Sequence, residues 1–202
     1  MLFVRYENWR QYLRYYPVTV AILAINLILF AAMEWYGSST DYETLLRFGA
    51  MFGLPGGALQ PEWWRYVTSV FLHIGGTHLL FNGFALFVFA PPLERLLGPI
   101  RYILFYLAAG AGGNLVSHWL HSDQYISAGA SGAIYGIYAA YMYLVLFRPF
   151  VLDQQSKQTI VAIVAIGLIY SLFPGVNLLA HLGGFLTGFA LMALLAAWYR
   201  RK

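Results

Sequence analysis

Two short motifs in this sequence combine a nucleophile with a base. The first reads Gly-Ala-Ser-Gly over residues 129–132 and contains Ser131, whose small neighbours leave its hydroxyl accessible. The second reads Ala-His-Leu-Gly-Gly over residues 180–184 and contains His181. A serine acts as a nucleophile when an adjacent base accepts its proton. We therefore predict a Ser-His dyad, with Ser131 as the nucleophile and His181 as the general base.

Glycines near both motifs predict how the serine and the histidine come together. Gly132 and Gly136 lie one helical turn apart, as do Gly184 and Gly188. Pairs of small residues at this spacing let two transmembrane helices approach closely. We therefore expect the two helices that carry the dyad to pack tightly. On its own, a Gly-x-Ser-Gly motif in a membrane helix is more typical of packing than of catalysis, and it lacks the second glycine of the soluble hydrolase elbow.

Two more polar residues have the chemistry to stabilise a developing negative charge. His78 and Asn82 are four residues apart, so they share one face of a helix, and both can donate hydrogen bonds. Together with the backbone N–H of Ser131 they are candidates for an oxyanion hole. Tyr135, one turn below the serine, is expected to hold His181 by ring packing. No acidic residue belongs to this set, so the predicted dyad has no carboxylate to orient its imidazole.

Other polar residues in or beside the apolar runs are expected to be structural. Asn26, Ser127 and Ser171 are typical of hydrogen bonds between neighbouring helices. His73 lies five residues before His78, which is about 140° away around an ideal helix. It is therefore predicted to lie on a different face from His78 and to bond loop backbone groups at the membrane edge.

The composition indicates the kind of element that must position these residues. Of the 202 residues, 60% are hydrophobic and 10% are charged, against about 25% charged in soluble domains. This excess of apolar side chains excludes a soluble enzyme, a disordered chain and a coiled coil. The sequence has no cysteine, which excludes disulfides and thiolate zinc sites. A membrane protein with several spans remains.

A spanning helix needs roughly 20 mostly apolar residues, and the sequence contains six such stretches. They cover residues 17–36, 75–96, 99–120, 127–147, 158–173 and 176–199. We therefore predict an all-α membrane protein, a bundle of six transmembrane helices. It forms a single membrane domain over residues 1–202, with an N-terminal segment 1–16, a six-helix core 17–199 and a tail 200–202.

The distribution of basic residues predicts how the bundle is oriented. With six spans both termini lie on one side, which holds ten of the twelve lysines and arginines, while the other side holds Arg47 and Arg65. Basic residues favour the cytoplasmic side. Both termini are therefore predicted to be cytoplasmic, in a multi-pass plasma (inner) membrane protein whose active site opens to the non-cytoplasmic side. The net charge of +4 follows from this topology and does not indicate binding to nucleic acid.

The longest connection between spans covers residues 37–74, on the non-cytoplasmic side. Its aromatic residues favour the bilayer interface, so we expect part of it to lie among the lipid headgroups. A short helix is predicted near residues 63–71, with a break at Gly75 and Gly76.

Taken in order along the chain, these motifs resemble the rhomboid family of intramembrane serine proteases, in its basic six-span bacterial form. The matching pieces are Trp64-Arg65, His73, the His-Leu-Leu-Phe-Asn motif of 78–82, the Glu-Arg-Leu-Leu-Gly motif of 94–98, the Gly-Ala-Ser-Gly motif with Tyr135, and the stretch from Ala180 to Gly188. Each motif alone is weak, but the ordered set covers about residues 17–199 and is specific. Two departures, a Pro91-Pro92 pair and the lack of an extra cytosolic domain or a seventh span, leave the dyad untouched.

The resemblance implies a role for each of these residues. It implies that Ser131 attacks the scissile carbonyl and that His181 is its general base. It implies that His78 and Asn82 stabilise the oxyanion. The supporting positions are Tyr135, Gly129, Gly132, Gly184, Gly188, Trp64 and Arg65. The tyrosine matches a residue that stacks on the catalytic histidine, and the tryptophan and arginine match a structural motif of the first loop.

The implied reaction is cleavage of peptide bonds in or near transmembrane segments of other membrane proteins, close to the membrane surface and after a small residue. Such an enzyme works within the lipid bilayer and uses no metal, organic cofactor or nucleic acid. Because a spanning helix hides its carbonyls in hydrogen bonds, the substrate must unwind and water must reach the serine. We therefore expect a water-filled cavity. Access is either past a mobile lid at residues 173–177 or laterally past the short fifth span.

Three other functions are weighed against this interpretation. A catalytically silent rhomboid-like protein would bind client transmembrane helices without cutting them, but such proteins lose the serine, the histidine or both. A small transporter or channel would spread carboxylates or histidines across the bilayer, whereas these polar groups gather toward one face. A metalloprotease is disfavoured because the sequence has no His-Glu-x-x-His motif.

Overall fold

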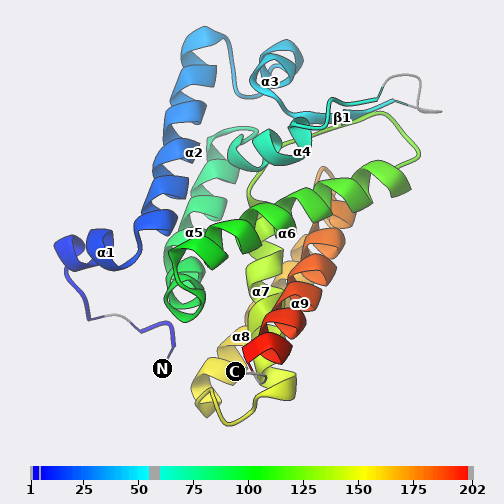
Figure 1. Ribbon diagram of the computed structural model, residues 1–202. Coiled ribbons are helices and arrows are strands. Elements are labelled where there is room, and N and C mark those ends of the chain that lie inside the picture. Colours follow the sequence, from blue (N-terminus) through cyan, green and yellow to red (C-terminus); the bar gives the residue numbers. More distant parts are fainter. Residues whose placement is uncertain (1, 5, 55–59, 200–202) are drawn as a thin grey trace.

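The computed structural model describes residues 2–4, 6–54 and 60–199, and Figure 1 shows how they are arranged. Six long helices form the body: α2 (Pro17–Tyr36), α5 (Gly76–Leu97), α6 (Pro99–Leu120), α7 (Ser131–Phe147), α8 (Gln154–Tyr170) and α9 (Leu178–Tyr199). They occupy the places of the six predicted spans, so the predicted helical membrane bundle is confirmed. By length and composition α2, α5 and α9 are each able to cross a membrane, and α7 is a shorter apolar helix.

Helix α7 lies at the centre of the bundle, packed between α6 and α9 (Figure 1). A Cβ atom added at Gly184 of α9 would lie 2.0 Å from the carbonyl oxygen of Gly132 in α7. One turn on, a Cβ at Gly188 would lie 2.4 Å from the carbonyl oxygen of Gly136. Both distances are far below van der Waals contact. The two backbones therefore touch directly, which confirms the predicted tight packing of the fourth and sixth spans.

The predicted start of the fourth span is wrong, because a short strand stands before α7. β1 (Met51–Gly53) pairs antiparallel with β2 (Tyr125–Ser127), with Met51 opposite Ser127. The fourth span is predicted from residue 127, but α7 begins at Ser131 because the chain before it is extended. The pairing holds the first loop of the protein against the segment that leads into α7.

The predicted boundaries of the fifth span are also wrong. The sequence places it at residues 158–173, whereas α8 begins and ends earlier, at Gln154 and Tyr170. Asp153 caps the helix, because its carboxylate accepts a hydrogen bond from the Ser156 N–H (3.0 Å). With this cap, the polar residues before position 158 join the helix although they are not apolar.

The remaining helices are short. The helix predicted near residues 63–71 is confirmed as α4 (Arg65–Thr68) followed by the 3-10 helix Ser69–Phe71. The predicted break is present, since Gly75 has a φ of +79° directly before α5. Two helices are absent from the sequence predictions: α1 (Trp9–Tyr15) and α3 (Tyr42–Phe48). Each has seven residues, too few for a hydrophobic period to stand out.

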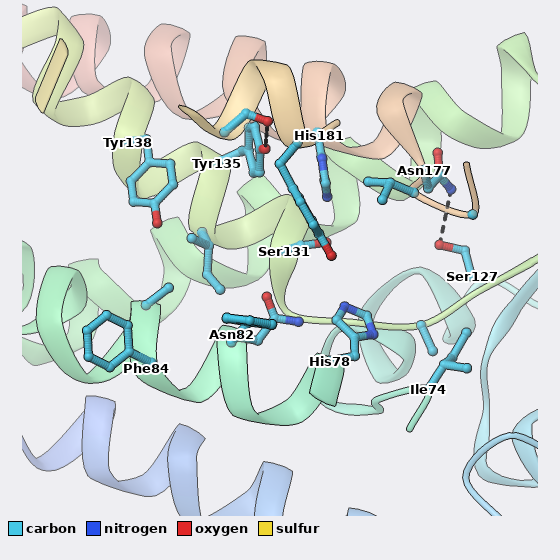
Figure 2. A pocket seen from close by; sticks show the side chains of 18 of the residues that line it. Ile74, His78, Asn82, Phe84, Ser127, Ser131, Tyr135, Tyr138, Asn177 and His181 are labelled. Carbon is cyan, nitrogen blue, oxygen red and sulfur yellow. Dashed lines mark hydrogen bonds between the residues drawn. The ribbon is translucent and has the colours of Figure 1, made fainter. Parts of the chain in front are cut away.

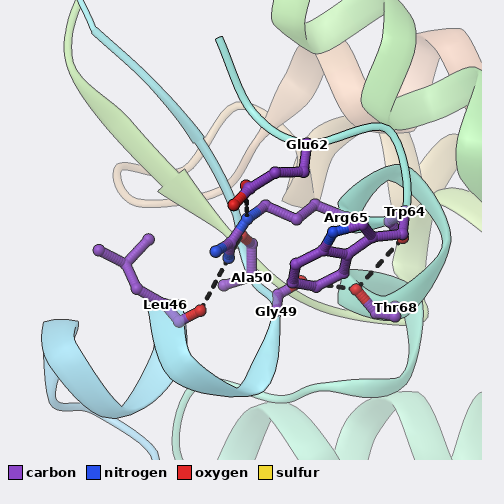
Figure 3. Close-up of polar contacts among 7 residues, drawn as sticks. All are labelled: Leu46, Gly49, Ala50, Glu62, Trp64, Arg65 and Thr68. Atoms are coloured by element: carbon purple, nitrogen blue, oxygen red, sulfur yellow. Dashed lines mark hydrogen bonds and ion pairs between the residues drawn. The ribbon is translucent and has the colours of Figure 1, made fainter. Parts of the chain in front are cut away.

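Arg65 organises the first loop, as Figure 3 shows. Its guanidinium donates to the carbonyl oxygens of Leu46 (2.8 Å) and Ala50 (3.0 Å), at the end of α3. It also pairs with the carboxylate of Glu62 and lies 4.6 Å from the ring centroid of Trp64. One side chain thus joins α3, α4 and the segment that continues into β1.

Glu94 joins the start of α2 to the end of α5, two helix ends that are distant in sequence. This carboxylate is only 2% exposed. It accepts hydrogen bonds from the N–H of Val18 (2.9 Å) and from the N–H and hydroxyl of Thr19 (2.8 and 2.6 Å). These donors belong to the first turn of α2, where backbone N–H groups have no partner within the helix. The contact fixes the start of α2 against the end of α5.

The N-terminal segment lies at the end of the bundle opposite β1 and β2 (Figure 1). The backbone N–H of Leu2 donates to the Ser156 hydroxyl (2.8 Å) at the start of α8. Phe3 packs edge-on against Phe89 of α5 and Tyr141 of α7, with ring centroids 5.0 and 5.4 Å apart. This segment therefore contacts three helices at once.

Candidate active site

A cavity of about 690 Å³ lies between α5, α7, α8 and α9. Ser131, His181, His78, Asn82 and Tyr135 all line it. Figure 2 shows Ser131 between the ring of His181 on one side and the α5 side chains on the other. The five polar residues that the sequence singles out for catalysis therefore meet in one place, although they come from three helices.

Ser131 is the first residue of α7 and follows a segment of the chain that passes close to α5. Gly129 just before it has a φ of +152°, and a Cβ there would lie 2.6 Å from Cε1 of His78 and 3.6 Å from Nδ2 of Asn82. This φ favours glycine, and any larger residue would press on the ring of His78. Within the described chain the Ser131 hydroxyl makes no hydrogen bond, so it is unengaged beside its two neighbours on α5.

His181 is held on two sides. Its ring stacks on that of Tyr135, with centroids 4.0 Å apart and planes 12° from parallel, so the predicted ring packing is confirmed. Its Nδ1 lies 2.7 Å from the hydroxyl oxygen of Ser171. The residue is 3% exposed. No hydrogen bond joins its ring to Ser131 among the described residues, an arrangement common in enzymes without substrate, where catalytic hydrogen bonds tighten only on binding.

Hydrogen-bond donors without partners gather beside the serine. The side-chain nitrogen Nδ2 of Asn82 is buried and has no partner among the described residues. The first intrahelical bond of α7 runs from the N–H of Ile134 to the carbonyl of Ala130, so the N–H groups of the first turn of α7 point out of the helix end. A helix N-terminus carries a partial positive charge. An oxyanion formed at Ser131 would therefore meet both a side-chain donor and backbone donors.

His73 lies in the loop before α5, as predicted, and is fully buried. Its ring interacts with the backbone of Phe71 in that loop. Its ring lies edge-on to that of His78, with centroids 5.3 Å apart. The helical angle used in the sequence prediction does not apply, because α5 begins only at Gly76. Burial, with a smaller contribution from His78, lowers the pKa of His73 to about 3.

Both segments considered for substrate access border the cavity. On one side are Pro174, Gly175, Val176 and Asn177 of the predicted lid. The side-chain amide of Asn177 donates to the Ser127 hydroxyl (3.1 Å), which fastens the lid to β2. On the other side are four residues of α8: Ile163, Ile166, Gly167 and Tyr170. Both routes of access therefore lead to the cavity.

The remaining predicted residues support the site from outside the cavity. Gly132, Gly184 and Gly188 form the contact between α7 and α9. Trp64 and Arg65 belong to the first-loop network and do not line the cavity. The described residues contain no group of three or more His, Asp or Glu side chains arranged to hold a metal ion.

Sequence reasoning missed two residues that contact the predicted site. The sequence predicts a packing role for Ser171, yet it contacts the ring of His181. It predicts Asn177 as part of the lid, yet the Oδ1 of this residue accepts from the N–H of Ala180 (3.0 Å) and so caps the helix that carries His181. An Asn three residues before position 180, two residues after a Pro-Gly pair, is a recognisable helix-start signal. No such local signal exists for the serine.

Comparison with known proteins places the chain among named relatives. The profile of the rhomboid domain matches residues 60–198. The chain is 37% identical over 194 residues to YdcA of Bacillus subtilis, whose name classes it with the rhomboid proteases, and the match covers 96% of both chains. It is 33% identical over 198 residues to the rhomboid protease AarA of Providencia stuartii, covering 85% of this chain and 69% of that protein. It is 36% identical over 178 residues to the rhomboid protease GluP of Bacillus subtilis, covering 88% of this chain and 34% of GluP.

Proposed function

This chain belongs to the rhomboid family of intramembrane serine proteases, and from this membership we propose that Ser131 and His181 are its catalytic dyad. The observation that carries the proposal is their placement at one end of the α7–α9 contact. There the two backbones touch, and both side chains face the same cavity. Direct backbone contact leaves little freedom in the distance between the helices.

In the proposed reaction the Nε2 atom of His181 accepts the proton of the Ser131 hydroxyl as the serine oxygen attacks the scissile carbonyl. The proton then passes to the leaving amine, and the acyl-enzyme remains. A water molecule repeats the sequence, and the serine regains its proton when the new carboxyl end departs. Negative charge on the tetrahedral oxygen is stabilised by the amide of Asn82, the ring of His78 and the N–H groups at the start of α7.

We further propose that the substrates are transmembrane segments of other membrane proteins. The gap between α5 and α8 supports this proposal, because large apolar side chains line it and also face outward. Phe81, Phe84 and Ile166 are 62%, 63% and 64% exposed, respectively. A hydrophobic segment therefore meets apolar surface on its way to the serine, and polar donors only at the end of the cavity where the bond is cut.

The catalytically silent alternative is less well supported than the protease. Its proteins lose a dyad residue, whereas this chain keeps Ser131 and His181 in one cavity, and its relatives are named proteases. The test is labelling of the purified protein in detergent with a fluorophosphonate probe. We expect wild type and Ser38→Ala, a serine that does not line the cavity, to label. Ser131→Ala and His181→Ala should not. Labelling that survives Ser131→Ala would show that another residue is the nucleophile.

We also propose that both termini are cytoplasmic, because ten of the twelve basic residues lie on the side of the termini. The chain has no cysteine, so single cysteines can report on topology. We expect a membrane-impermeant maleimide to label Ser122→Cys in intact cells. Gln11→Cys should react only after the cells are opened. The reverse pattern would contradict the proposed orientation.

A further inference from the structure

We propose that Ser171 is a positioning residue of the dyad, which holds His181 in the tautomer protonated at Nδ1 and makes this tautomer depend on the position of α8. The chemical consequence rests on the proposed function, in which His181 is the base. The tautomer itself does not, because it follows from hydrogen bonds within the protein.

Ser171 is placed to do this because it ends α8 and reaches across to α9. It is 2% exposed and follows Tyr170, the last residue of the helix. Its hydroxyl oxygen lies 2.7 Å from Nδ1 of His181 and 2.7 Å from the hydroxyl of Tyr135. It also lies 2.8 Å from the carbonyl oxygen of Gly167, which the Tyr135 hydroxyl contacts as well. The same tyrosine that stacks on the imidazole thus shares a hydrogen-bond partner with it.

Counting donors and acceptors in this cluster selects one arrangement. The Gly167 carbonyl already accepts one hydrogen bond, from the N–H of Ser171 (2.9 Å), and has one lone pair left. If His181 carries its proton on Nδ1, that N–H donates to the serine oxygen and the serine hydroxyl donates to Gly167. The Tyr135 hydroxyl contacts both the Gly167 carbonyl and the serine oxygen, and in this arrangement it donates to the serine oxygen. All three side-chain donors have acceptors, and every lone pair of the serine oxygen is used.

The other tautomer makes fewer hydrogen bonds. If Nδ1 of His181 carries no proton, the Ser171 hydroxyl must turn to donate to it. Only that hydrogen bond and the one from Tyr135 remain, so the cluster has two side-chain donors in place of three. In a buried site each missing hydrogen bond is costly. The cluster therefore favours protonation at Nδ1.

This preference fixes the tautomer and orientation of the imidazole, as a carboxylate does in other serine hydrolases. With the proton on Nδ1, the Nε2 atom of His181 keeps its lone pair for the proton of Ser131. When the ring becomes positively charged during the reaction, its Nδ1–H still donates to Ser171. The serine hydroxyl in turn donates to the Gly167 carbonyl, so the backbone of α8 holds the serine in place as the acceptor of the His181 proton.

The position of α8 becomes part of this arrangement. Ser171 and Gly167 both belong to the end of α8, and α8 packs chiefly on α7. A displacement of that end away from α7 removes the acceptor from His181. If α8 moves aside to admit a substrate, the base is fully oriented again only when α8 returns.

The direct test is ¹⁵N NMR of histidine-labelled protein in detergent, since the shifts of the two ring nitrogens distinguish the tautomers. The chain has five histidines, and loss of one signal in His181→Ala assigns the dyad histidine. We expect His181 of wild type to be protonated at Nδ1, and we expect Ser171→Ala to populate the Nε2-protonated form. Equal spectra for His181 in wild type and Ser171→Ala would overturn the proposal, whether or not the protein proves to be a protease.

Kinetics supply the second readout. Loss of one neutral hydrogen bond predicts that Ser171→Ala lowers the rate of fluorophosphonate labelling and kcat by about tenfold, with little change in KM. Ser171→Thr keeps the oxygen and should restore most of the rate. Ser156→Ala is the matched control, since it removes a buried serine from the other end of α8 and should leave the rate unchanged. An equal loss of rate in Ser156→Ala and Ser171→Ala would indicate a general loosening of α8 and would contradict a specific role.

Discussion

At the scale of single residues, the site contains polar groups whose hydrogen-bonding capacity is unused. The Ser131 hydroxyl and the amide nitrogen of Asn82 both lack a partner among the described residues. The Asn82 nitrogen is buried, and an unpaired buried donor costs stability. In the proposed reaction the negative oxygen of a tetrahedral intermediate supplies its missing partner.

Replacement of Asn82 measures its share of this stabilisation. We expect Asn82→Ala to lower kcat for a transmembrane substrate by roughly 10²–10³-fold, as in other oxyanion holes, with a much smaller effect on KM. Asn114→Ala is a suitable comparison, because that asparagine bonds the backbone of Tyr66 and the side chain of Ser69 instead. An Asn82→Ala enzyme with unchanged kcat would exclude this residue from the oxyanion hole.

At the scale of elements, the sequence predicts those parts of the site whose signals are local. The spacing of Gly132 and Gly136, repeated in α9, predicts the helix contact that the structure contains. His78 and Asn82 share a face as their spacing requires. Ser171 is different, because its role depends on where the end of α8 folds relative to α9. Spacing within one helix carries no information about that.

The α7–α9 contact predicts the effect of one added methyl group. Gly184→Ala would place a Cβ 2.0 Å from a backbone oxygen, which cannot turn aside as a side chain can. We expect it to lower the free energy of unfolding by about 1–3 kcal/mol, the usual cost of overpacking, and to slow fluorophosphonate labelling strongly. At Gly83 of α5 the nearest atom to an added Cβ is 4.0 Å away, so Gly83→Ala should be tolerated. Similar behaviour of both variants would argue against a rigid contact.

Two arginines of the first loop are expected to contribute unequally to the free energy of unfolding. Arg65 is 9% exposed and bonds two backbone carbonyls, a geometry that the single ammonium group of a lysine does not reproduce. We expect Arg65→Lys to lower the free energy of unfolding by about 2 kcal/mol, from loss of hydrogen bonds to a charged group. Arg47 forms an exposed pair with Glu43 and lies 5.9 Å from the ring centroid of Tyr36, and a lysine can make both contacts, so Arg47→Lys should have almost no effect. Thermal unfolding in detergent would measure both.

At the scale of the whole molecule, the described chain joins distant segments through a few buried polar contacts. Glu94 joins α2 to α5, and the N-terminal segment joins α5, α7 and α8. The sequence predicts the bundle from its apolar runs, but these contacts connect residues up to 154 positions apart. Composition and periodicity describe one segment at a time, so they give no sign of which segments meet.

The buried imidazole of His73 predicts how the stability of the whole molecule depends on pH. Its pKa is about 3 in the folded protein, below the ordinary 6.5. Between these values the unfolded chain binds a proton that the folded protein does not, so the free energy of unfolding falls as the pH drops below 6.5 and this fall ends near pH 3. From this group alone we expect a loss of about 2 kcal/mol at pH 5 relative to pH 8.

Thermal unfolding of wild type and His73→Gln at pH 8 and pH 5 would check this expectation. The glutamine is neutral at both values, so the variant should lose less of its melting temperature on acidification. His78 lies beside the same ring and is unchanged in both proteins, so its own effect cancels in the comparison. Parallel losses in the two proteins would show that His73 is not the group responsible.

The contact between α7 and α9 has a consequence for how such an enzyme can diversify. The distance between the two helices that carry the proposed dyad is set by main-chain atoms at Gly132, Gly136, Gly184 and Gly188, which substitutions of side chains facing lipid or the cavity do not touch. Side chains that face lipid or line the cavity can therefore be exchanged to suit a new substrate while the spacing of the reacting groups stays constant. Selectivity and chemistry can thus be altered independently of each other in this scaffold, whether by natural variation or by design.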